Sequence, residues 1–210
     1  MNKDDKTNIT RRYVDRLKQH GPGIQALASG TTERRATRFG VLSSIGDLHG
    51  ASVLDLGCGL ADFNAYLKER GIDVCYTGYD IIPEFIRLAT DRYPDAHFEL
   101  RDIQADGIPE RFDYIVSSQT FNNRLVHEDN VQLMQDVMRL CYDACNKGVA
   151  IDMVTSYVDF RENHLFYYSP EDIFRYAKSL TKRVLLRHDY PQYEFAILLY
   201  KDFTGWKNDP

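Results

Sequence analysis

Short apolar runs alternate with amphipathic stretches along most of the chain. Runs typical of buried strands lie at 53–56, 74–79, 112–116 and 148–154. Between them, apolar residues recur at helical spacing, for example Val131, Met134, Val137, Met138 and Cys141 within 127–141. Strands that alternate with helices are typical of βαβ units. The pattern therefore predicts an α/β fold with a mostly parallel, doubly wound sheet.

The remaining elements complete this picture. Helices are predicted at 9–18, 31–45, 62–70, from about 83, and from 170 to about 180, and the first ends at Gly21-Pro22-Gly23. A third strand is expected near 98–103, and two more at 183–188 and 194–200, which makes seven. The link between the last two is so short that these strands must be antiparallel.

A single domain is expected for residues 1–210. We divide it into an N-terminal helical cap, 1–48, and a core, 49–210. The stretch 155–168 is polar and aromatic without a clear period, and a long loop of this kind in a compact domain is often a functional lid. The alternative is an ordinary connection whose aromatic side chains cover the sheet.

The most informative segment is 53–63, where a buried strand breaks into a turn with Gly57 and Gly59 and then opens a helix. Glycine lets backbone approach a ligand closely, and the free N–H groups of the next helix face it. The third glycine of a dinucleotide fingerprint is missing, and no Gly-Lys-Ser/Thr sequence follows. These absences disfavour NAD and a phosphate loop.

Polar residues follow the next strands as well. Asp80 ends the second strand, at the spacing where a carboxylate meets ribose hydroxyls, although an aspartate there also fits a helix N-cap. Asp102 ends the third strand, where the alternative is an ordinary loop residue. Ser118 follows the fourth strand.

Together these segments resemble class I S-adenosylmethionine (SAM)-dependent methyltransferases, in which hydrophobic-Asp-x-Gly-x-Gly is the first motif. The resemblance covers roughly 51–122. It implies a Rossmann-like sheet of seven strands with a last antiparallel strand, SAM as cofactor and S-adenosylhomocysteine (SAH) as product. The cofactor-binding residues that it implies, together with an arginine on the preceding helix for the methionyl carboxylate, are Asp55, Gly57, Cys58, Gly59, Asp80, Ile81, Asp102, Ile103, Ser118 and Arg38.

The acceptor is expected at the carboxyl ends of the strands. Candidate acceptor-binding residues are Asn122, Asn123, Tyr157 and Phe160. A general base is needed only if the acceptor loses a proton, and His164 and His127 are candidates because histidine titrates near neutral pH. Tyr168 is a third catalytic candidate, able to orient the acceptor. For each histidine, a structural or surface role is the alternative.

Composition limits the partners. The net charge is −5, and the arginine pairs at 11–12 and 34–35 form no stripe, so nucleic acid is not expected as a partner. No run of 18 apolar residues and no signal segment occurs, so we expect a cytoplasmic protein without a membrane partner. The four cysteines have no partners at metal spacing and are interpreted as reduced, with no metal site.

The leading hypothesis is an enzyme that transfers a methyl group from SAM to oxygen or nitrogen of a small molecule. The whole-chain pattern is similar to bacterial methyltransferases of small-molecule biosynthesis, which suggests a sugar or an amino compound as acceptor. Two alternatives stay open. One is a non-catalytic nucleotide-binding module, expected to lack room beside the sulfonium. The other is a protein methyltransferase, expected to have a broad exposed groove.

Overall fold

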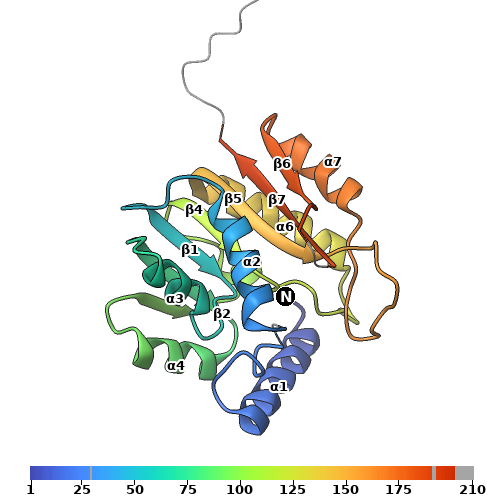
Figure 1. The fold of residues 1–210 in the computed structure, drawn as a ribbon. Coiled ribbons are helices and arrows are strands. Elements are labelled where there is room, and N and C mark those ends of the chain that lie inside the picture. The colour runs from blue at the N-terminus through green and yellow to red at the C-terminus, as the bar shows by residue number, and fades with distance from the viewer. Residues whose placement is uncertain (29, 191–192, 202–210) are drawn as a thin grey trace, which may run out of the picture.

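Seven strands form one sheet in the computed structural model, which describes residues 1–28, 30–190 and 193–201 (Figure 1). Their order is β3-β2-β1-β4-β5-β7-β6, and β7 is antiparallel to both of its neighbours. All other pairs are parallel. The strands are β1 (Ser52–Leu56), β2 (Cys75–Asp80), β3 (His97–Leu100), β4 (Phe112–Ser117), β5 (Cys145–Val154), β6 (Val184–Arg187) and β7 (Glu194–Tyr200).

The predicted fold is confirmed, including the antiparallel last strand. This strand lies between β5 and β6 rather than at the edge of the sheet. It has no exposed residue, and Phe195 to Leu199 are all fully buried, as expected for a strand that is paired on both sides. The turn predicted at 189–192 includes positions 191 and 192, which lie outside the described residues.

Helices cover both faces of the sheet, which explains why the strand runs are continuously apolar. Along β1, Val53 packs with the layer of α2 and α3, whereas Leu54 packs with the layer of α6 and α7. The helices are α1 (Lys3–His20), α2 (Thr32–Ser43), α3 (Asp62–Glu69), α4 (Pro83–Arg92), α5 (Ile103–Asp106), α6 (Asn130–Ala144) and α7 (Pro170–Leu180).

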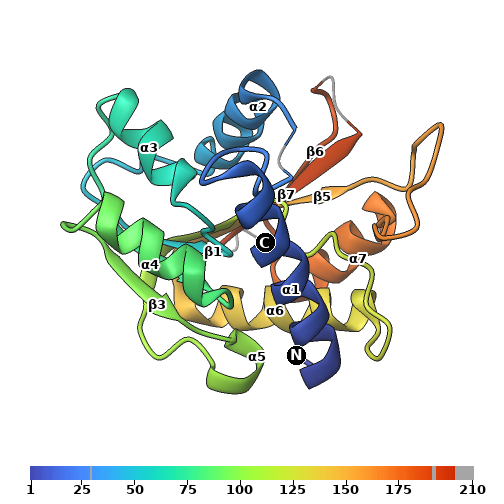
Figure 2. The same cartoon turned by 90° about the horizontal axis from the view of Figure 1, so that it is seen from below.

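Helix α1 lies across the end of the sheet, between the two helical layers (Figure 2). It begins earlier than the pattern predicts, because Asn2 caps it by accepting from the Asp4 N–H at 2.8 Å. The buried Asp5 carboxylate then accepts from the backbone N–H groups of Val126 and His127, at 2.9 and 3.0 Å. The polar first turns of α1 are therefore attached to the loop before α6.

The two N-terminal helices have different positions. Phe39 and Leu42 of α2 are buried in the same cluster as Val53 of β1, so α2 belongs to the main helical layers rather than to a cap. The aromatic stretch 155–168 is attached to the core at both ends. Thr155 bridges to Tyr168, and Leu165 bridges to Asn123.

Candidate functional site

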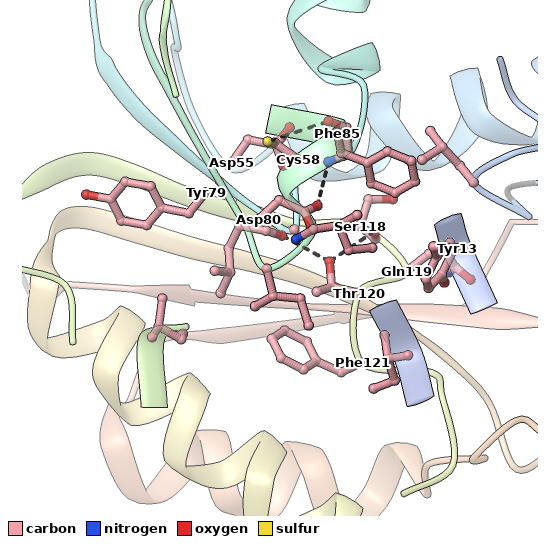
Figure 3. A pocket seen from close by; sticks show the side chains of 18 of the residues that line it. Tyr13, Asp55, Cys58, Tyr79, Asp80, Phe85, Ser118, Gln119, Thr120 and Phe121 are labelled. Atoms are coloured by element: carbon pink, nitrogen blue, oxygen red, sulfur yellow. Dashed lines mark hydrogen bonds between the residues drawn. The ribbon is translucent and has the colours of Figure 1, made fainter. Parts of the chain in front are cut away.

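A cavity opens where the carboxyl ends of β1, β2 and β4 meet α1 (Figure 3). We call it the first cavity. It is lined by every predicted cofactor-binding residue except Arg38. These residues come from the turn after β1, the end of β2, the start of α5 and the segment after β4. The motif spacing therefore predicted which residues meet at this edge of the sheet.

The turn after β1 needs glycines because its backbone is left-handed and a side chain would collide with neighbouring residues. Gly57 has φ +73°, and a Cβ there would lie 2.2 Å from the Thr120 hydroxyl oxygen. At Gly59, with φ +52°, a Cβ would lie 2.8 Å from a methyl of Leu27. Ala61, where related motifs often have glycine, also has a left-handed conformation, with φ 59°. The turn is thus held tightly between the segment after β4 and the segment after α1.

Asp80 lies in the centre of the side chains shown in Figure 3. Its carboxylate accepts from the N–H groups of Gly59 and Ile82, both at 2.9 Å. It therefore connects the turn after β1 with the turn before α4. The alternative role of Asp80 as the N-cap of α4 is wrong, because the N-cap is Ile82 and no side chain in the described part of the chain caps this helix. Burial raises the pKa of Asp80 to about 6. A carboxylate has about four acceptor positions, so two remain for a ligand that donates hydrogen bonds.

Asp102 lies at the end of the same cavity and is buried. It caps α5 by accepting from the Gln104 N–H. It also pairs with the ammonium of Lys6 at 3.2 Å and with the N-terminal ammonium of Met1 at 3.4 Å. The buried side-chain oxygen of Gln104 has no hydrogen-bond partner in the described part of the chain. An acceptor without a partner, beside the apolar Ile81 and Ile103, suits a flat ring with an exocyclic amino group.

The first cavity is acidic. Asp55, Asp62, Asp80 and Asp102 line it, against three cationic groups, which are the guanidinium groups of Arg35 and Arg101 and the N-terminal ammonium of Met1. Burial raises the pKa of Asp55 to about 7, although the Tyr76 hydroxyl donates to it. These acceptors fit SAM, whose hydroxyl and ammonium groups donate hydrogen bonds and whose sulfonium is positively charged. The guanidinium of Arg35 lies on the cavity wall, where it pairs with Asp62.

A second cavity, of about 460 Å³, adjoins the first. Tyr13, Leu27, Gln119 and Asn123 line both. The side-chain amide of Gln119 donates to Asp152 at 2.9 Å and accepts from Asn122 at 2.7 Å. The predicted acceptor residues Asn122 and Asn123 and the predicted base His164 line this second cavity. A space of this size accommodates a small molecule.

Other predicted residues lie elsewhere. Tyr157 and Phe160 are exposed and line neither cavity. Their rings contact His188 and Tyr193 instead. The aromatic stretch therefore contributes Glu162, His164 and Leu165 to the second cavity, not its most prominent aromatic side chains.

Two catalytic candidates and one cofactor candidate are likewise outside both cavities. His127 is exposed beside α1. Tyr168 is buried and donates to the carbonyl of Phe121 at 2.8 Å, which makes it part of the core. Arg38 is buried on the face of α2 that meets β7, where it pairs with Glu194 at 3.3 Å. Arg35, one turn earlier on α2, lines the first cavity in its place.

Sequence reasoning missed the residues that join the cavities, above all Tyr13 and Gln119. Tyr13 belongs to α1 and packs edge-on against Phe85. Gln119 has the left-handed conformation, with φ 59°. The signal that could have found α1 is its apolar spacing, with Ile9, Tyr13, Val14 and Leu17 on one face.

The described part of the chain has neither a metal site nor a membrane-spanning helix. No group of three or more His, Cys, Asp or Glu side chains within 1–28, 30–190 and 193–201 is arranged to hold a metal ion. None of the helices in the same part of the chain is long and apolar enough to cross a bilayer.

Comparison with known proteins agrees with the geometry. Residues 53–143 match a family described as a methyltransferase domain. The protein Rv1506c of Mycobacterium tuberculosis, provisionally described as a methyltransferase, is 35% identical over 158 residues, which are 71% of this chain and 93% of that protein. Magnesium-protoporphyrin O-methyltransferase of Rhodobacter capsulatus is 35% identical over 98 residues, 44% of this chain and 42% of that enzyme.

Solved structures share the fold. Magnesium protoporphyrin IX methyltransferase from Synechocystis PCC 6803 with bound SAH has a TM-score of 0.68 at 14% identity, covering 95% of this chain and all of that one. The same enzyme with bound SAM has a TM-score of 0.65 at 15% identity, covering 96% of this chain and 100% of that one. The motifs, the sheet order and the similarity to Rv1506c over 93% of that protein lead to one conclusion. The chain belongs to the class I SAM-dependent methyltransferases, and SAM is its cofactor.

Proposed function

We propose that this methyltransferase transfers the methyl group to oxygen or nitrogen of a small molecule bound in the second cavity. The observation that carries the proposal is the second cavity itself, which adjoins the first and shares Tyr13, Gln119 and Asn123 with it. A non-catalytic binding module would have no space beside the cofactor for an acceptor. A cavity bounded by α1 and by residues 162–165 suits a small molecule better than a protein chain.

Within the first cavity, the residues divide by chemistry. Asp80 would accept from the ribose hydroxyls with its two remaining acceptor positions. Ile81 and Ile103 would pack on the adenine ring, and the free side-chain oxygen of Gln104 together with Asp102 would accept from its amino group. Gly57, Gly59 and Arg35 would hold the methionyl part.

The transfer is an in-line displacement at the methyl carbon. The bond from the acceptor atom to carbon forms while the carbon–sulfur bond breaks, and the electron pair of that bond stays on sulfur as the sulfonium becomes a neutral thioether. Alignment of the reacting atoms supplies most of the acceleration. An acceptor hydroxyl or amine also loses a proton, and His164 on the cavity wall is the group that would take it.

The state of His164 suits that task. Burial and the charge of Arg12 lower its pKa, partly opposed by Glu162. The imidazole is therefore mostly neutral at neutral pH and can accept a proton.

The names of related proteins also support a small acceptor group. Two of those that match act, by their names, on magnesium-protoporphyrin and on a malonyl-acyl carrier protein. The first of these names describes a small molecule, and the second a small acyl group on a carrier. A protein acceptor is the competing class.

The test uses SAM with a labelled methyl group and identifies the molecules that receive the label. The purified protein is incubated with an extract of its source cells, which is then separated into small-molecule and protein fractions. We expect label in the small-molecule fraction, and much less of it with Asp80→Ala at the same SAM concentration. Label found in the protein fraction alone would contradict a small-molecule acceptor.

A further inference from the structure

The second cavity differs in charge from the rest of the molecule. Arg12 and Arg16, one turn apart on α1, both line it, together with His164. Its only carboxylate among the described residues is that of Glu162, which is half-exposed and lies 3.4 Å from the His164 imidazole. The chain as a whole has a net charge of −5, so a wall with two guanidinium groups is not the average surface of this protein.

The two guanidinium groups have donors to spare. Arg12 donates to the side-chain oxygen of Asn123 at 3.2 Å, and Arg16 donates to the backbone carbonyl of Gln25. In the described part of the chain, neither has a carboxylate within 4.0 Å, and the buried Nε of Arg16 has no hydrogen-bond partner. A guanidinium presents five donors in a planar fork that matches an oxyanion.

The two guanidinium groups also affect the pKa of His164. Its pKa is lowered by burial and by the charges of Arg12 and Arg16, while Glu162 raises it. An ordinary imidazole close to two cations stays neutral, and an anion bound between them would reverse that effect.

The first cavity has the opposite balance, with four carboxylates on its wall against the guanidinium groups of Arg35 and Arg101 and the N-terminal ammonium of Met1. A cationic sulfonium on one side and an anionic acceptor on the other would each meet the complementary charge. Such separation of charge also keeps the acceptor from entering the cofactor cavity.

We infer that the acceptor carries an oxyanion group, a carboxylate or a phosphate, which Arg12 and Arg16 bind in the second cavity. The inference rests on the proposed function, because it names the class of molecule that this cavity holds. It also explains why α1 contributes to the site, since both arginines and the shared Tyr13 belong to this helix.

The test uses the full-length protein saturated with SAH and labelled with ¹⁵N. It is titrated separately with inorganic phosphate, with succinate and with the uncharged succinamide, at constant ionic strength, while backbone and histidine signals are followed by NMR. We expect both anions to shift the signals of α1 and His164, and the amide to leave them unchanged. A stronger response to succinate assigns a carboxylate, and a stronger response to phosphate assigns a phosphate.

The variants separate this cavity from general charge effects. The double variant Arg12→Gln, Arg16→Gln should weaken anion binding about tenfold or more, because charge-assisted bidentate contacts are lost. Arg11→Gln is the matched control, since Arg11 is an exposed neighbour that donates to Asn8. In the double variant the pKa of His164 should rise, and in the wild type it should rise when the anion binds.

Failures of the two proposals can be told apart. SAH binding without any response to the anions, or an anion response that the double variant retains in full, overturns the anionic acceptor. Absence of SAH binding by the wild-type protein, measured before the titrations, would instead contradict the proposed function.

Discussion

Gln119 is the residue on which the two cavities depend most. It lines both, and its left-handed backbone is held by Asp152, which accepts from its backbone N–H at 2.7 Å and from its side-chain amide. Asp152 also accepts from the Ser118 hydroxyl, at 2.8 Å, and is fully buried. A strained conformation of this kind persists only where neighbouring groups fix it.

Asp152→Ala should therefore destabilise the protein by about 3–5 kcal/mol, because several buried donors lose their acceptor and the buried Arg38 loses a nearby negative charge. Urea unfolding followed by circular dichroism measures this free energy. Asp136→Ala, on the exposed face of α6, is the control and should change it by less than about 0.5 kcal/mol. A loss for Asp152→Ala no larger than the control's would show that Asp152 does not hold the turn.

Asp55 and Asp80 give the stability of the ligand-free protein a characteristic pH dependence. Burial raises their pKa values to about 7 and about 6, from 3.8. Between these limits the folded protein keeps protons that the unfolded chain has released, so the free energy of unfolding falls as pH rises. Each group contributes at most about 1.4 kcal/mol per pH unit.

Asp55→Asn keeps an acceptor for the Tyr76 hydroxyl but removes one titrating group. Its unfolding free energy should decline less steeply between about pH 4 and about pH 7 than that of the wild type. Unfolding in urea at several pH values provides the comparison, with Asp136→Asn as the control. Identical slopes for Asp55→Asn and wild type would refute the raised pKa.

The sequence predicted that the residues after the strands meet in one site, because their spacing along the chain is set by the length of a strand–helix–strand unit. It did not predict Arg12, Arg35 or Tyr13, since their place depends on how α1 and α2 pack against segments far along the chain. Asn123, for example, is 111 residues from its partner Arg12. Arg38 and Arg35 differ by less than one turn of α2, so sequence alone could not tell which one faces the cavity.

At the scale of elements, α1 is the least buried helix that contributes to the site. Among its residues only Asp5 is fully buried, and its inner face packs Tyr13, Val14 and Leu17 against the small cluster around Phe85. A helix attached by so few apolar contacts opens at lower free energy than the core. Access to both cavities is expected to involve movement of α1.

Asp5→Ala removes the acceptor of the Val126 and His127 N–H groups and should loosen α1 specifically. Hydrogen exchange followed by mass spectrometry should show faster exchange in residues 3–20, with the strands unchanged. Asp15→Ala, at an exposed position of α1, serves as the control. Exchange in α1 that matches the wild type would mean that other contacts hold the helix.

Element boundaries show where local pattern was sufficient. The last strand, 194–200, and the start of α3 at Asp62 follow directly from apolar runs and from the glycine turn. The predicted start of α6 near 127 was early, because Asp129 caps the helix by accepting from the N–H groups of Val131 and Gln132. The exposed Tyr157 and Phe160 show that aromatic content alone does not mark a binding surface.

At the scale of the whole molecule, the main difference between the two cavities is the charge of their walls. The two cavities adjoin each other beside α1. Carboxylates outnumber the cationic groups on the wall of the first, whereas the second has two arginines and one carboxylate, in a protein of net charge −5. The fold places the cofactor at the ends of the strands, where α/β sheets bind ligands. The N-terminal helix α1, which lies outside the matched range 53–143, contributes residues to both cavities.

The most direct test of this division is calorimetric titration of SAH into the wild type, Asp80→Ala and Arg16→Gln, with folding of each variant verified first. The wild type and Arg16→Gln should bind SAH with similar micromolar affinity. Asp80→Ala should bind it about 1.5–3 kcal/mol more weakly, the cost of losing hydrogen bonds to a charged group. Wild-type affinity in Asp80→Ala, or an equal loss in Arg16→Gln, would contradict a cofactor cavity centred on Asp80 and separate from the acceptor cavity.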